Sequence, residues 1–234
     1  MKKSYKVLLT ATFVVLYFLL VTFTVIESVA YSDFLYYKHY ESNSATSRTG
    51  LTDEELVYIT DEIQSFLKGN RDDFDIKITR NDKDVSVFNE QEILHMNDVQ
   101  VLFLKYRALR DGSIVLILML IVTLKKMYRK DLYSAIKISL CVLIGMYALI
   151  AVGGFFFFDE LFVVFHKIFF TNDLWFFDIN TSILVNILPT NFFIECASRI
   201  GIYSVLVYTV LTVIFTVVAK RPQKVDSVCG SKGE

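Results

Sequence analysis

The sequence predicts a multi-pass α-helical membrane protein with four transmembrane helices, a small α+β extracellular domain after the first helix and an aromatic interfacial loop before the fourth. Three observations support this prediction. Of 234 residues, 54% are hydrophobic and only 21% charged; the mean hydropathy is +0.46; and long apolar runs alternate with clusters of Lys and Arg. The net charge of −1 leaves no general basic surface for binding nucleic acid, so that class of partner is excluded.

The candidate spans are apolar runs of about 20 residues, the length that crosses about 30 Å of hydrocarbon. The first, third and fourth spans cover residues 7–26, about 135–158 and about 192–219. The second is harder to place, because its clean apolar stretch, 114–124, is about half the required length and must extend back to about Tyr106. Ser28-Val29-Ala30 resembles a signal-peptide cleavage site, but the apolar run before it is too long for a signal peptide and favours an uncleaved anchor.

Clusters of positive charge predict the orientation, since short cytoplasmic loops carry the excess of Lys and Arg. The clusters are Lys2, Lys3 and Lys6; Lys125, Lys126, Arg129 and Lys130; and Lys220, Arg221 and Lys224. Both termini are therefore expected in the cytoplasm of a bacterial cell membrane. The expected parts are the N-terminus with the first helix (1–30), the extracellular domain (31–104), the second and third helices with their short basic loop (105–158), the extracellular aromatic loop (159–191), and the fourth helix with a cytoplasmic tail (192–234).

The extracellular domain has its own local signals. Thr52-Asp53-Glu54-Glu55 has the form of a capping box and begins an apolar period of about four helical turns, which Gly69 ends. Residues 74–79 then alternate with period two, and 85–88 follow the polar turn 80–84, which predicts a β-hairpin.

The second extracellular segment is dense in Phe and contains the single Trp, as is typical of chains at the level of the lipid headgroups. Pro189 interrupts the apolar pattern just before the fourth span. A short helix that re-enters or grazes the membrane is therefore expected there.

Two of the three histidines, His95 and His166, flank predicted spans on the outer side, where they could exchange protons near neutral pH. The simplest alternative is that each is an interfacial polar residue with a hydrogen-bond partner. His95, Asp98 and His166 could also ligate a metal, and Cys196 could accept an acyl group beside His166, but both patterns are weak. His39 has no neighbours in the sequence that indicate a role.

Five charged residues fall at or near membrane depth, where charge is costly and often functional. A structural role is favoured for all five. Arg107, Arg110 and Asp111 can snorkel above the hydrocarbon. Glu195 and Arg199 are spaced to pair on one helix.

Two strings carry a family resemblance. Residues 92–99, EILHMNDV, and residues 165–178, FHKIFFTNDLWFFD, resemble the signature segments of the bacterial lipoprotein intramolecular transacylases, a family of four-helix integral membrane proteins. The later Leu184, Pro189, Phe192 and Phe193 fit the same pattern, as does the order of spans and loops. The chain departs from the expected motif where Asp178 is followed by Ile179 in place of Pro.

The resemblance implies an activity. Such enzymes move an acyl chain within a diacylglyceryl-modified lipoprotein from the sn-2 ester to the α-amine of the N-terminal cysteine, giving the lyso-form. It also implies that His95 and His166 are the acid-base pair. No cofactor and no metal are expected, and the expected partners are the lipoprotein and membrane lipid; the sequence does not indicate an oligomeric state.

The chemistry assigns roles to the residues around the two histidines. An α-amine with a pKa of about 7.7 to 8.0 must lose a proton before it attacks the ester, and the oxyanion then needs a donor. Oxyanion or orienting candidates are Asn97, Asp98 and Asn172; substrate-lining candidates are Met96, Phe169, Phe170 and Trp175. To lower His95 toward the lipid ester, we expect a helix break at Asn97-Asp98, unless the membrane boundary lies nearer Val99 with the arginines in a polar cavity.

Two other classes of function also fit the sequence. A non-enzymatic sensor or assembly protein would bind a partner through the acidic segment 31–104, which holds 15 acidic and 7 basic residues. A membrane lipid-ester hydrolase would deliver the acyl chain to water instead of to an amine.

Overall fold

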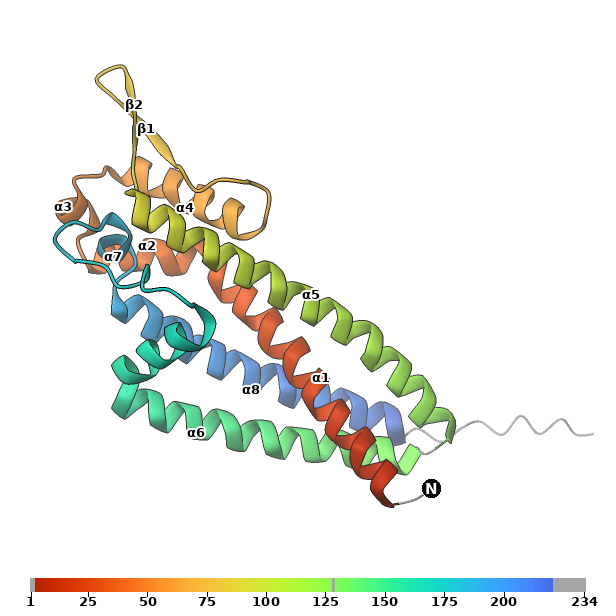
Figure 1. The fold of residues 1–234 in the computed structure, drawn as a ribbon. Helices are drawn as coiled ribbons and strands as arrows, with labels where there is room; N and C mark the ends of the chain where they lie inside the picture. Colours follow the sequence, from red (N-terminus) through yellow and green to blue (C-terminus); the bar gives the residue numbers. More distant parts are fainter. Residues whose placement is uncertain (1–2, 128, 221–234) are drawn as a thin grey trace, which may run out of the picture.

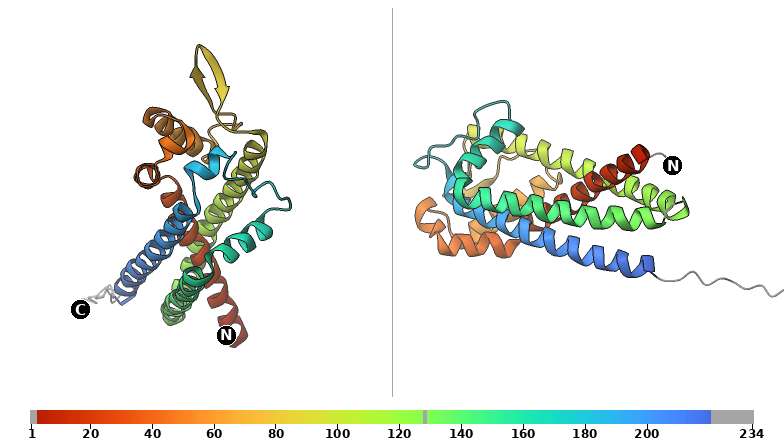
Figure 2. Two further views of the ribbon diagram at one scale, coloured as in Figure 1. Left: turned by 90° about the vertical axis from the view of Figure 1, so that its left-hand side faces the viewer. Right: turned by 90° about the horizontal axis from the view of Figure 1, so that it is seen from below.

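The computed structural model describes residues 3–127 and 129–220, and Lys2, Arg221 and Lys224 of the charge clusters lie outside them. Four long helices run side by side (Figure 1): α1 (Lys3–Ala30), α5 (Glu90–Met127), α6 (Arg129–Phe169) and α8 (Thr190–Lys220). α1 packs against the other three, and Figure 2 shows the same bundle from two further sides. Inside it, the Thr22 hydroxyl bonds the Tyr147 hydroxyl at 2.7 Å, so a polar pair links α1 to α6.

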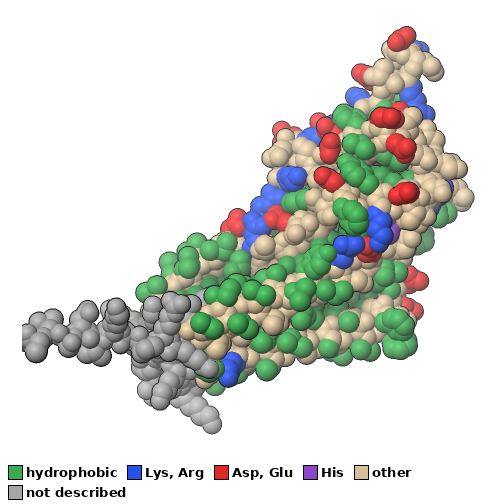
Figure 3. All heavy atoms as spheres, turned by 180° about the vertical axis from the view of Figure 1, so that it is seen from behind, with side chains coloured by type: hydrophobic (Ala, Val, Ile, Leu, Met, Phe, Trp, Pro, Cys, Tyr) green, Lys and Arg blue, Asp and Glu red, His purple; other side chains and the backbone are tan. Residues whose placement is uncertain are grey.

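Three of these helices are long and apolar enough to cross a membrane: Val7–Ala30, Ile136–Phe169 and Thr190–Ile214. On the face shown in Figure 3, hydrophobic side chains predominate along the long helices, whereas most Asp and Glu side chains lie towards one end of the molecule. The expected second span lies in α5, whose exposed Val115, Leu118 and Val122 also face outward. Charged residues flank this short apolar stretch on both sides, and a span there stays a prediction.

One end of the bundle carries a small α+β unit, residues 33–86, which we call the end domain (Figure 1). It contains α2 (Asp33–Ser42), α3 (Ala45–Thr49), α4 (Asp53–Leu67), β1 (Lys77–Arg80) and β2 (Lys83–Ser86). The predicted capping box is confirmed: the Thr52 N–H donates to Glu55 at 2.8 Å, and the Glu55 N–H donates to the Thr52 hydroxyl at 3.2 Å. Gly69, at φ +76°, follows the end of α4 as expected.

The hairpin is confirmed, but its turn is tighter than the sequence suggested. Lys77 pairs with Ser86 and Arg80 with Lys83, so only Asn81 and Asp82 form the turn. Both have positive φ, 53° and 59°, which Asn and Asp tolerate better than other non-glycine residues. The predicted five-residue turn was therefore wrong by three residues.

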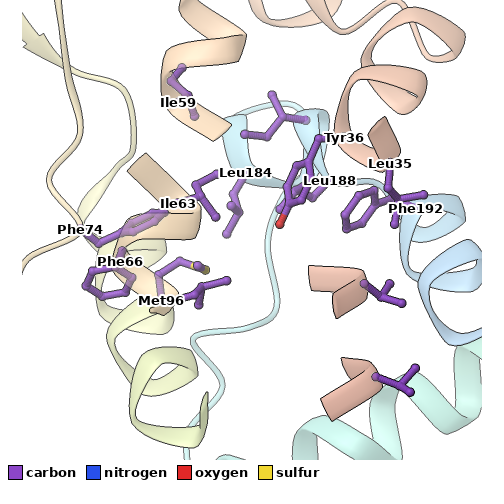
Figure 4. Packing of buried hydrophobic residues seen from close by; sticks show 14 of the residues in the cluster. Leu35, Tyr36, Ile59, Ile63, Phe66, Phe74, Met96, Leu184, Leu188 and Phe192 are labelled. Atoms are coloured by element: carbon purple, nitrogen blue, oxygen red, sulfur yellow. The ribbon is translucent and has the colours of Figure 1, made fainter. Parts of the chain in front are cut away.

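Buried side chains of the end domain continue into the helices beneath it (Figure 4). Ile63 and Phe66 of α4, with Phe74 before the hairpin, pack near Met96 of α5. Leu184 of α7 (Ile183–Ile187) joins the same core, and Pro189 follows α7 as predicted. The core thus fixes the first turns of α5 against the segment that precedes α8.

The expected break at Asn97-Asp98 is wrong, because α5 is one continuous helix across it. The bend occurs instead in α6, where Phe157 has the non-helical angles φ −138° and ψ 38°. As a result residues 158–169, expected to lie mostly in a loop, are helical and turn from the end of the long part of α6 towards α8 (Figure 1). It is this bend that redirects the segment carrying His166.

Arg107 and Arg110 have the structural roles expected of them. Arg107 Nε lies 2.7 Å from Glu27 of α1, and Arg110 pairs with the same carboxylate. Arg107 also donates to the carbonyls of Leu67 and Lys68 at the end of α4. Since these terminal carbonyls have no partner within their own helix, Arg107 joins the end domain to the bundle.

Candidate active site

His95 and His166 lie together although they come from different helices. His95 is on the second turn of α5 and His166 is near the end of α6, and their ring centroids are 6.0 Å apart. Their residues are 7% and 6% exposed. The two rings are therefore closer than the roughly 10 Å above which they could not take part in the same proton transfer.

A backbone carbonyl fixes the tautomer of His166. Nδ1 lies 2.7 Å from the carbonyl oxygen of Phe162, one helical turn earlier. Because a carbonyl oxygen only accepts, Nδ1 carries the hydrogen and Nε2 has a free electron pair. His166 is therefore oriented to accept a proton at Nε2.

His95 has an incomplete set of partners. Its Nδ1 is buried, and no group in the described part of the chain forms a hydrogen bond to it. Burial, followed by the nearby His166, lowers the pKa of His95 from 6.5 to about 4, while Asp98 acts in the opposite direction. The ring is thus neutral at physiological pH, and its Nδ1 has no hydrogen-bond partner among the described residues.

Aromatic rings enclose the pair. Trp175 stacks on His166 with centroids 4.7 Å apart, and Phe177 lies 5.4 Å from His95. Phe170 contacts both imidazoles, at 5.2 Å and 5.6 Å. The two imidazoles therefore have apolar neighbours, and Phe170 and Trp175 stand where lining residues were expected.

Three other candidates are placed differently. Met96 is 6% exposed and lies in the core beside Phe66 (Figure 4), so it does not line the histidine pair. Asn97 is two positions from His95 on an unbroken helix, and residues so spaced face different directions. Phe169 is half exposed and packs on Phe165.

Asp98 and Asn172 orient the loop beside the pair. The Asn172 amide donates to the Asp98 carboxylate at 2.8 Å, and the Asn172 carbonyl accepts from Trp175 Nε1 at 3.0 Å. Asp98 thereby holds Asn172 in place, and the backbone carbonyl of Asn172 in turn holds the indole of Trp175. One hydrogen of the Asn172 amide is already engaged, which favours the orienting role for both residues over the oxyanion role.

Cys196 and the metal alternative gain no support. Cys196, on α8, packs against the hydrophobic core, which is an ordinary position for a cysteine with a structural role. Within residues 3–127 and 129–220, no group of three or more His, Cys, Asp or Glu side chains is arranged to hold a metal ion.

Two features were missed by reasoning from the sequence. His39 is 5% exposed, and its Nε2 lies 2.9 Å from Glu195, which also pairs with Arg199 as predicted and with Lys38. Glu92 is 1% exposed and holds the segment before α7. The spacing of Asn89 and Glu92 before an apolar run is a capping signal that could have identified it.

The comparisons with known proteins agree with this architecture. The family model described as lipoprotein intramolecular transacylase matches residues 10–193, more than half of the chain. A solved structure of the membrane-integral lipoprotein intramolecular transacylase of Bacillus cereus matches with a TM-score of 0.77 and 18% identity, over 93% of this chain and 97% of that one. Comparison with curated protein sequences gives no match.

Two further structures of the Bacillus cereus protein carry a single histidine substitution. The alanine variant matches with a TM-score of 0.71 and 20% identity, over 93% of this chain and 94% of that one. The arginine variant matches with a TM-score of 0.68 and 20% identity, over 91% and 92%. At these identities the likeness shows the fold.

Proposed function

Because the chain belongs to the lipoprotein intramolecular transacylase family and is a membrane-integral bacterial acyltransferase, we propose that it transfers the sn-2 acyl chain of a diacylglyceryl lipoprotein to the α-amine of the N-terminal cysteine. The observation that carries this proposal is the His95–His166 pair, 6.0 Å apart within aromatic walls. The product is the lyso-form lipoprotein.

His166 is the base in this proposal. Its Nε2 takes a proton from the α-ammonium, and the Nδ1 hydrogen bond to Phe162 remains in the imidazolium and stabilises it. The freed amine attacks the sn-2 carbonyl carbon, forming a C–N bond and a tetrahedral oxyanion. The C–O bond to glycerol then breaks.

Between the α-ammonium and the amide the nitrogen loses two protons, of which the leaving glyceryl oxygen takes one and the other passes to solvent. After attack the nitrogen sheds its second proton, and the glyceryl oxygen gains one from the imidazole pair. His95, held neutral by burial, passes a proton readily once it is charged. Donor and acceptor belong to one molecule, so holding them close and dry supplies the remaining acceleration without an acyl-enzyme.

We also propose four spans, with both termini in the cytoplasm and the histidine pair at the outer leaflet. The Lys and Arg clusters and the exposed apolar face of α5 support this topology. A cysteine introduced at Asp61, labelled in intact cells with an impermeant maleimide, is expected to react from outside. Labelling only after the cells are opened would overturn it.

Mass spectrometry of lipoproteins from cells with and without the protein tests the activity. A transacylase leaves the total acyl mass unchanged and moves one chain to the amine, which fragmentation of the N-terminal peptide locates. A hydrolase would lower the mass by one acyl chain. A sensor or assembly protein would change neither, and either of these results would refute the proposal.

A further inference from the structure

The segment that encloses the histidine pair is tied to α5 on both sides of Trp175. The Gln91 side-chain amide donates to the carbonyl of Leu174 at 3.0 Å and to the carbonyl of Phe176 at 3.1 Å. Both amide hydrogens are thus used, one on each side of the tryptophan. This fork fixes the backbone from which Trp175 stacks on His166.

Glu92, the next residue, holds the other end of the same segment. Its carboxylate accepts from the Ser182 hydroxyl at 2.5 Å and from the Leu184 N–H at 2.8 Å. It also accepts from the Asn89 N–H at 2.8 Å, within the N-terminal cap of α5. Ser182 in turn accepts from the Val185 N–H, so one carboxylate joins the caps of two helices.

The position of these two residues gives them more than a role in folding. They come three and four residues before His95, on the turn of α5 that precedes it. The segment they hold carries Trp175 against His166 and Phe177 against His95. A buried carboxylate that loses its donors is strongly unfavourable, so Glu92 keeps this segment closed on the pair.

We propose that Gln91 and Glu92 are positioning residues that clamp residues 174–184 over His95 and His166 and thereby set the geometry of both imidazoles. The clamp itself stands on the contacts above, whereas its contribution to rate rests on the proposed acyl transfer. Misplacing a reacting group by about 1 Å can lower a rate by about a hundredfold.

The full-length protein in detergent or bilayer offers a direct readout, because Trp175 is its single tryptophan. Gln91 is exposed, so Gln91→Leu removes both donors without emptying the core. Glu92→Gln keeps the volume but places an amide against N–H donors. Glu90→Gln is the matched control, since it makes the same chemical change at an exposed site on the same turn.

We expect Gln91→Leu and Glu92→Gln to increase acrylamide quenching of Trp175 about twofold and to lower kcat about tenfold to a hundredfold with little change in KM. Glu90→Gln should change neither. Unchanged quenching in Gln91→Leu, as well as in Glu92→Gln, would overturn the clamp. Altered quenching with full kcat would overturn its positioning role. If the wild-type protein transferred no acyl chain, the proposed function would fail while the fluorescence still decided the clamp.

Discussion

Two sites with buried imidazoles lie near the same end of the bundle and differ in how their nitrogens are satisfied. At the first, His39 bonds Glu195 through Nε2 at 2.9 Å and Asn43 through Nδ1 at 3.2 Å. At the second, His95 leaves Nδ1 without a partner among the described residues. All three histidines are almost equally buried. Burial alone therefore does not distinguish them, whereas the unsatisfied nitrogen does, because buried polar atoms in proteins are normally hydrogen-bonded.

The largest expected effect separates the two sites by rate. His95→Ala and His166→Ala should each lower acyl transfer by about 10² to 10⁴, the usual contribution of an acid-base residue, while the protein still inserts. His39→Ala should keep a rate within about threefold of wild type, because its nitrogens are engaged by protein groups. Transfer assayed on a purified diacylglyceryl lipopeptide provides the measurement, and a comparable loss in all three variants would remove the distinction.

The next effect concerns acid stability. The folded protein holds the pKa of His95 near 4, whereas the unfolded chain protonates at about 6.5, so the unfolded state binds the extra proton between these values. Stability should therefore fall by about 3 kcal/mol as the pH drops from 6.5 to 4. His95→Gln should remove this part of the pH dependence. Thermal unfolding in detergent across that range would show it, and identical slopes in the two proteins would contradict the assignment.

A smaller effect is expected at the first site, where both nitrogens of His39 have hydrogen-bond partners. Glu195→Gln weakens the bonds to His39, Lys38 and Arg199, so we expect a loss of about 1 to 3 kcal/mol in stability. Acyl transfer at a temperature well below the unfolding transition should be unaffected. A fall in kcat without a fall in the unfolding temperature would instead make this cluster part of the catalytic site.

The smallest effect is expected at Cys196. Its thiol packs among core residues of α8, so Cys196→Ala should change the transfer rate by less than about twofold. The measurement is again lipopeptide turnover. Loss of activity, together with capture of an acylated wild-type protein, would replace direct transfer by a covalent intermediate.

Local patterns were sufficient for features that depend on neighbouring residues. The capping box at Thr52, the stop at Gly69 and the pair Glu195–Arg199 each involve residues within a few positions, and all three are confirmed. The length of the apolar runs likewise identified three helices of membrane-spanning length. That His95 of residues 92–99 and His166 of residues 165–178 act as a pair was implied by the family resemblance.

Features that depend on distant partners could not be predicted from the sequence. His39 and Glu195 are 156 positions apart, and Glu92 meets Ser182 across 90 positions. The direction of a side chain on a helix was the other difficulty. Met96 and Asn97 lie within two positions of His95 in the sequence, but the continuous α5 points them elsewhere, and the bend that redirects the segment carrying His166 lies at Phe157.

The tether from Glu92 to Ser182 has a consequence for biosynthesis. The two partners are separated by 90 residues, so at about 5 to 20 residues per second Glu92 leaves the ribosome roughly 5 to 18 seconds before Ser182. During that interval Glu92 has its local donor, the Asn89 N–H, but not its bonds to Ser182 and Leu184. The contacts by which Glu92 holds the end of the segment over the histidine pair can consequently form only when the last quarter of the chain is made.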